Sequence, residues 1–152
     1  MKLILGILRS FKYAFRGVLL CIKHETNFRI HLLAVIYVSI FSLLYRLTYI
    51  EYILLFMTFG FVIFAEMINT VIETLINMNV NGFNSFARNA KDITAGAVMI
   101  FSFFSVGIAF FLFNDISKWI RIFNLFRNNF PLAIILLISF VPAILFIKGK
   151  KH

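Results

Sequence analysis

The chain has 152 residues, of which 62% are hydrophobic and 14% are charged, and its mean hydropathy is +0.96. Soluble domains contain about 45–50% apolar residues, so this composition excludes an ordinary soluble protein. The formal net charge of +9 indicates attraction to anionic lipid, because the cations border hydrophobic segments. For the same reason nucleic acid is not expected as a partner.

The first predicted element is an amphipathic helix within residues 1–29. Arg9, Lys12, Arg16 and Lys23 recur on one side of this helix, opposite a row of apolar side chains. These cations interrupt the apolar run and no small-residue cleavage site follows, so the segment does not have the pattern of a signal peptide. It is typical of a helix that lies on the surface of an anionic bilayer.

Four apolar segments follow, each approaching the roughly 20 residues that a helix needs to cross a bilayer. These segments are residues 30–45, 52–76, 93–113 and 130–147. The predicted fold class is therefore all-α, an integral membrane helical bundle. In it, residues 30–113 form a three-helix core and residues 114–152 form an extension. The extension should contain a second interfacial helix at 117–128 and a fourth span, kinked at Pro142.

Charge sets the expected orientation of this multi-pass protein. With a cytoplasmic amino terminus, eleven of the fifteen cations lie on the inner side of the membrane, which the positive-inside rule favours. The four outer cations are Arg46, Lys118, Arg121 and Arg127. This orientation places the segment from Glu66 to Asn77 at the inner end of the second span.

The second span carries an acidic face. Glu66, Asn69 and Glu73 stand at positions i, i+3 and i+7, so they share one side of a helix with 3.6 residues per turn. An ionisable group deep in a membrane costs on the order of 2.5–3.5 kcal/mol on insertion scales. A pair of carboxylates at this depth therefore indicates a functional site.

Two further polar groups are expected near this face, at the entrances to the first and third spans. Carboxylates from these groups suit Mg²⁺, which commonly bridges one or two carboxylates to the phosphates of a substrate. A buried carboxylate can also take the proton of an alcohol during phosphoryl transfer. The alternative is a structural role, such as an ion pair between Glu73 and Lys91. For His24 and His31 a structural role outweighs a catalytic one. The group at the entrance to the first span is Glu25, Asn27, Arg29 and His31. The group at the entrance to the third span is Lys91 with Asp92.

Four blocks of the sequence, residues 11–17, 25–31, 66–73 and 90–98, resemble the prokaryotic diacylglycerol kinase family. The resemblance covers roughly residues 8–113, with all blocks in order. It is most specific where the acidic face around Glu66 is followed by Ala90, Lys91 and Asp92. Within the family, the sequence of these blocks is most similar to the undecaprenol kinase branch of Gram-positive bacteria.

This resemblance implies a small lipid kinase of the bacterial cell membrane. It would act as a homotrimer and move the γ-phosphoryl group of ATP to a lipid alcohol at the cytoplasmic surface, with Mg²⁺ required. By position, Glu66 matches the general base, and Glu25 and Glu73 match the carboxylates that hold the metal with ATP. The implied nucleotide contacts are Tyr13, Glu25, Glu73, Lys91 and Asp92. The implied supporting or substrate-binding residues are Asn27, Arg29, Asn69, Thr70 and Ala95.

The chain departs from the family pattern in three places. Many members have Asp at the position of Asn77, the loop 81–86 lacks an expected acidic or aromatic residue followed by His, and an extension follows from about residue 114. The expected substrate is undecaprenol, with diacylglycerol as the alternative. A non-catalytic membrane adaptor of the same fold is a further alternative. An ion conductor is disfavoured, because the last two spans carry few polar side chains.

Overall fold

The computed structural model describes residues 2–79 and 84–149, and the regular structure in this part of the chain is helical. The helices α2, α3, α4 and α6 are long and apolar enough to cross a membrane, so the predicted all-α fold with four candidate spans is confirmed. In chain order the helices are α1 (Lys2–His24), α2 (Thr26–Tyr45), α3 (Tyr49–Asn79), α4 (Ser85–Leu112), α5 (Ile116–Asn128) and α6 (Phe130–Lys148).

α2, α3 and α4 begin before the predicted apolar segments, and at the start of α4 a polar side chain supplies a cap. α4 begins at Ser85, where the side chain of Asn84 accepts hydrogen bonds from Phe86 N and Ala87 N at 3.0 and 3.2 Å. α6 continues past Pro142 to Lys148, so this proline does not end the helix. The predicted interfacial helix of the extension is α5, which Asp115 caps through Ser117 N at 2.9 Å.

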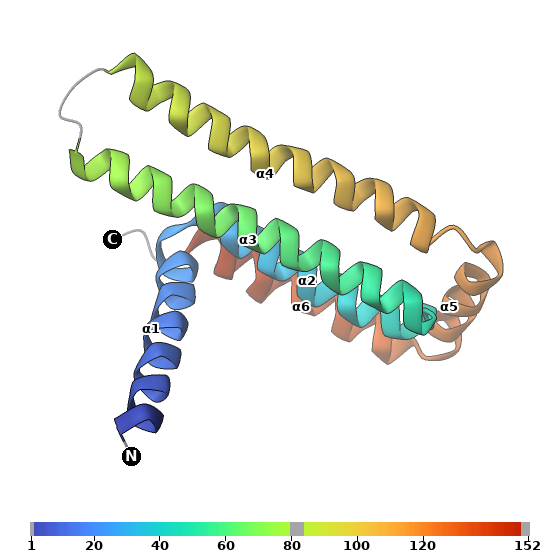
Figure 1. Ribbon diagram of the computed structural model, residues 1–152. Coiled ribbons are helices and arrows are strands. Elements are labelled where there is room, and N and C mark those ends of the chain that lie inside the picture. The colour runs from blue at the N-terminus through green and yellow to red at the C-terminus, as the bar shows by residue number, and fades with distance from the viewer. Residues whose placement is uncertain (1, 80–83, 150–152) are drawn as a thin grey trace.

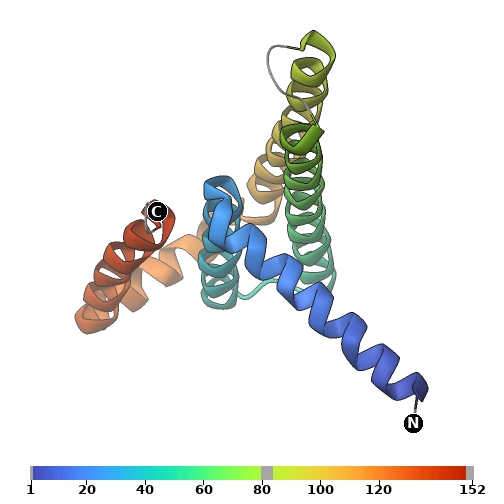
Figure 2. The same ribbon diagram turned by 90° about the vertical axis from the view of Figure 1, so that its left-hand side faces the viewer.

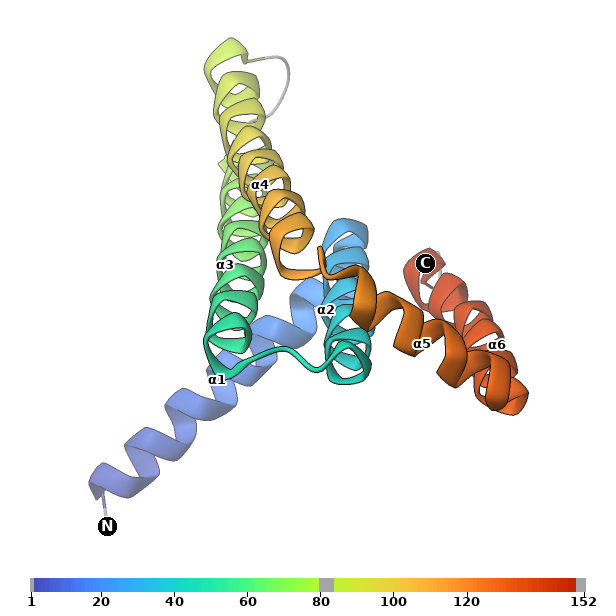
Figure 3. The same ribbon diagram turned by 90° about the vertical axis from the view of Figure 1, so that its right-hand side faces the viewer.

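The helices form an open row rather than a closed bundle. α3 and α4 run antiparallel as a hairpin, α2 packs against α3, and α6 lies on the other side of α2 (Figures 1 and 3). α1 leaves the start of α2 at a steep angle and projects away from the spans (Figure 2). The α1–α2 junction and the end of α6 lie at one end of the row, and α5 lies at the other (Figure 1).

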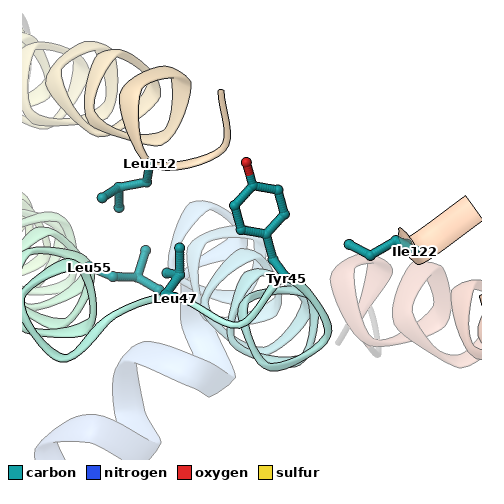
Figure 4. Close-up of a cluster of buried hydrophobic side chains, with 5 residues drawn as sticks. All are labelled: Tyr45, Leu47, Leu55, Leu112 and Ile122. Atoms are coloured by element: carbon teal, nitrogen blue, oxygen red, sulfur yellow. The ribbon is translucent and has the colours of Figure 1, made fainter. Parts of the chain in front are cut away.

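A small apolar cluster joins the extension to the spans at the α5 end. Tyr45 stands between Ile122 of α5 and three leucines from the other segments, Leu47, Leu55 and Leu112 (Figure 4). The ring of Tyr45 is fully buried, and its hydroxyl donates to Asp115 O at 3.2 Å. Most other large apolar side chains are exposed, as expected for helices that face lipid.

An arginine side chain also holds the extension at the α5 end of the row. Arg121 of α5 donates through Nη2 to Leu44 O and Tyr45 O, at 3.3 and 2.9 Å. These carbonyl groups belong to the last turn of α2 and have no partner within that helix. The extension is thus attached to the end of α2 by both polar and apolar contacts.

Candidate active site

Glu66 lies on α3, and its side chain is 2% exposed. His31 of α2 approaches it, with Nε2 3.4 Å from Glu66 Oε1. Among the described residues, however, Glu66 Oε1 has no hydrogen-bond partner. A buried acceptor without a donor costs on the order of 1–3 kcal/mol, so this oxygen is available to an incoming donor such as an alcohol.

Asn69 and Glu73 continue the acidic face one and two turns further along α3. Asn69 Nδ2 donates to Glu73 Oε1 at 3.0 Å, which fixes the amide and holds the carboxylate. This orientation leaves Asn69 Oδ1 as a second buried oxygen without a partner in the described part of the chain. The predicted grouping of Glu66, Asn69 and Glu73 on one side of a helix agrees with the positions of these contacts.

Glu25 lies between α1 and α2, where it is the residue before the first turn of α2. Burial, and after it the negative charges of Glu73 and Glu66, raise the pKa of the Glu25 carboxyl above its ordinary value. α1 also reaches α3 here, since buried Cys21 lies beside Thr70. The fold therefore brings Glu25 into the electrostatic range of both acidic residues of α3.

We expect Glu25→Gln to stabilise the nucleotide-free protein at neutral pH. Because the folded-state pKa is raised, the stability linked to this carboxyl is present below its unfolded pKa and is lost as the pH rises through the folded value. The variant should therefore unfold at a higher temperature than wild type at pH 7 and at the same temperature near about pH 4. Thermal unfolding in detergent measures both. If the variant and wild type were equally stable at pH 7, the negative charges of Glu73 and Glu66 would not destabilise the ionised Glu25 carboxylate.

The polar residues at the start of α4 lie at the opposite end of the helical hairpin from α5 (Figure 1). Lys91 Nζ donates to Asn77 Oδ1 at 2.7 Å, so the amide at position 77 holds this lysine. Asp92 Oδ2 lies 3.8 Å from Arg88 Nε, and both side chains are 71% exposed. Neither contact connects α4 to Glu25. Residues 81–83 of the altered loop lie outside the described residues.

The remaining predicted residues lie in different environments. Tyr13 is exposed at the middle of α1, the helix that projects from the row (Figure 2). Asn27 and Ala95 are exposed, and Thr70 Oγ1 donates to Glu66 O at 3.0 Å. Arg29 is buried and donates to backbone carbonyl groups at the ends of two helices.

An apolar groove of about 200 Å³ runs between α2, α3 and α4. His31, the neighbour of Glu66, is one of its lining residues. The other lining residues are mostly aliphatic and aromatic, with Thr58 and Ser105 as the polar exceptions. Such a groove suits a hydrocarbon chain rather than a nucleotide.

The contact of His31 with Glu66 was not predicted, because His24 and His31 flank Glu25 at a spacing that favours a structural role over a catalytic one. Only the pairing of α2 with α3 reveals that His31 faces Glu66. The available signal was its place in the same block as Glu25, six residues away along the chain.

The donor set fits a magnesium ion held together with phosphate. No group of three or more His, Cys, Asp or Glu residues within 2–79 and 84–149 gathers closely enough to bind a metal by itself. Magnesium does not require such a cage, since it retains waters and uses one or two carboxylates plus substrate oxygens. Glu25 and Glu73 supply two carboxylates whose mutual repulsion a cation would relieve.

Comparisons with known proteins identify the family of the chain. Residues 12–113 match the family described as prokaryotic diacylglycerol kinase. An undecaprenol kinase of Bacillus subtilis (strain 168) is 34% identical over 106 residues, which cover 68% of this chain and 86% of that protein. A diacylglycerol kinase of Synechocystis sp. is 33% identical over 96 residues, which cover 62% of this chain and 55% of that protein. No solved structure matches at a significant level. The chain belongs to the prokaryotic diacylglycerol kinase family, and it is a lipid kinase.

Proposed function

We propose that this lipid kinase transfers the γ-phosphoryl group of ATP to the hydroxyl group of undecaprenol, giving undecaprenyl phosphate and ADP. The observation that carries the proposal is the buried Glu66 carboxylate, which has an unpartnered oxygen and lies against His31 beside an apolar groove. A deep proton acceptor next to a groove for hydrocarbon suits an alcohol whose tail remains in the membrane.

In the proposed reaction, the lipid hydroxyl oxygen forms a bond to the γ-phosphorus as the bond from that phosphorus to the bridging oxygen of ADP breaks. Glu66 Oε1 accepts the hydroxyl proton, and His31, whose Nε2 lies 3.4 Å from this oxygen, orients the carboxylate. Asn69 holds Glu73 at 3.0 Å and so keeps the second carboxylate facing the phosphates. Such positioning supplies most of what phosphoryl transfer requires from a protein.

Glu25 and Glu73 would hold Mg²⁺ together with ATP. When bound, the metal neutralises charge on the phosphates. The proposed contacts of the nucleotide outside this pair are Tyr13, Lys91 and Asp92, with Asn27, Thr70 and Ala95 in support. Because Asp92 and Lys91 lie at the start of α4 and Tyr13 lies on the projecting α1, these contacts fit a site that a neighbouring protomer of the proposed homotrimer completes.

The relatives support the proposed preference for undecaprenol. The match covers 86% of the Bacillus undecaprenol kinase but 55% of the cyanobacterial diacylglycerol kinase. We expect purified protein to phosphorylate undecaprenol faster than diacylglycerol when both are presented in the same mixed micelles. Transfer of label from [γ-³²P]ATP to each lipid measures this. Diacylglycerol phosphorylation far above that of undecaprenol would reverse the assignment.

We further propose that the amino terminus and the active site face the cytoplasm. The α1–α2 junction lies at the same end of the row as the end of α6, and α5 lies at the other end (Figure 1). This arrangement suits a membrane whose inner leaflet meets the cationic surface of α1, which would bind anionic lipid.

A further inference from the structure

Arg29 connects three helix ends. Its guanidinium donates to Ile22 O and Lys23 O of α1 at 2.9 and 3.2 Å, and to Ile147 O of α6 at 3.1 Å. It also donates to Thr26 Oγ1, in the first turn of α2, at 3.0 Å. The side chain is 7% exposed, so these are buried contacts of a charged group. Carbonyl groups in the last turn of a helix have no partner within the helix and attract a cation.

The contacts of Arg29 enclose Glu25. Ile22 and Lys23 precede this residue and Thr26 follows it, so the guanidinium binds the backbone before the α1–α2 junction and a side chain after it. Within the part of the chain that the structure describes, the hydrogen bonds of Glu25 are backbone bonds, from Glu25 N to Cys21 O at 2.9 Å and from Arg29 N to Glu25 O at 3.3 Å. The position of the junction that carries Glu25 therefore depends on where Arg29 is held.

The extension completes this arrangement. Gly149, directly after α6, approaches the guanidinium so closely that a Cβ built on it would lie 3.2 Å from Arg29 Nη2. Closer to the middle of α6, the Tyr37 hydroxyl donates to Ser139 O at 2.9 Å, and the Tyr37 ring stacks on Phe140. The end of α6 is thus held against Arg29 by contacts along α2.

We propose that Arg29 and Gly149 are positioning residues through which the carboxyl-terminal extension sets the place of Glu25 in the active site. The inference rests on the proposed role of Glu25 in holding the metal with ATP. It assigns the extension a part in catalysis and assigns Arg29 to helix ends, rather than to the substrate. Loss of such supporting contacts around a metal site typically costs about 10–100-fold in affinity or activity.

Gly149→Ala tests the proposal from within the extension. The added Cβ would lie 3.2 Å from Arg29 Nη2, so the guanidinium must shift to make room for it. The backbone at φ +59° also disfavours any side chain at this position. We expect the Mg²⁺ concentration for half-maximal activity to rise about tenfold with a smaller change in kcat. Gly107→Ala is the matched control, because a Cβ at Gly107 meets nothing within 4 Å. Arg29→Lys should have a larger effect, since one ammonium group cannot replace the fork of a guanidinium.

Two readouts separate this proposal from general destabilisation and from the proposed function. Hydrogen exchange of the amides at 22–28, measured without nucleotide, should be faster in Gly149→Ala than in Gly107→Ala. In a Glu25→Gln background, Gly149→Ala should add no further rise in the Mg²⁺ requirement. Wild-type activity with unchanged exchange and Mg²⁺ requirement in Gly149→Ala would overturn the inference. An inactive wild type would overturn the proposed function, and the exchange experiment would still decide the role of Arg29 and Gly149.

Discussion

Glu66→Gln is expected to reduce kcat by about 10²–10⁴-fold, the usual contribution of a general base. Glutamine keeps the size of the side chain and an acceptor oxygen near His31, but it does not take a proton from an alcohol. Because Glu66 is buried and separated along α3 from Glu73, binding of ATP with Mg²⁺ should remain close to that of wild type.

The measurement is label transfer from ATP to lipid in mixed micelles, together with ATP binding on the same preparation. Glu51→Gln is a matched control at the other end of α3, where the side chain accepts a hydrogen bond from Thr48 N. It should retain wild-type turnover. Near wild-type turnover in Glu66→Gln would remove this residue from the role of base.

Glu73→Gln is expected to raise the Mg²⁺ requirement by about tenfold or more, while saturating Mg²⁺ restores part of the activity. A neutral amide replaces one of two carboxylates proposed to hold the ion, and carboxylate oxygens are the ligands that Mg²⁺ prefers. Asn69 Nδ2 can still donate to the amide oxygen of glutamine, so the contact at 3.0 Å is retained and the loss reports on charge.

A titration of activity against Mg²⁺ at fixed ATP measures this effect. The same Glu51→Gln control should follow the wild-type curve. An unchanged Mg²⁺ titration in Glu73→Gln would remove Glu73 from the metal site, whatever its effect on kcat.

The fold could largely be predicted, because a bilayer restricts spanning segments to long apolar helices. All four apolar segments form helices, and the cationic segment at the amino terminus forms α1. The helix ends were less predictable. Polar caps such as Asn84 extend α4 well before residue 93, and hydropathy does not register hydrogen bonds.

The part of the candidate site that lies on one helix was predictable in detail, and the approach of Glu25 to it was expected only from the orientation of the spans. The spacing of Glu66, Asn69 and Glu73 fixes their common face, because helical geometry relates residues three, four and seven apart. Contacts between helices depend on packing that one sequence does not reveal. The approach of His31 to Glu66 and the capping of α6 by Arg29 belong to this second class.

The sequence of the extension predicts an interfacial helix and a fourth span but indicates no function for them. Its docking depends on side chains far apart in the chain, such as Tyr37 with Ser139 and Arg121 with the end of α2. No periodicity within the segment encodes these pairs. The extension therefore gains a functional interpretation only from the structure.

We propose that Glu25 and Glu73 hold a divalent cation with ATP, apart from the base at Glu66. The most direct test is electron paramagnetic resonance of Mn²⁺ as a probe for Mg²⁺, titrated with the protein in the presence of a non-hydrolysable ATP analogue. We predict that wild type and Glu66→Gln bind Mn²⁺ with similar affinity, and that the Glu25→Gln, Glu73→Gln double variant loses this binding. Unchanged Mn²⁺ binding in the double variant would show that Glu25 and Glu73 do not hold the cation.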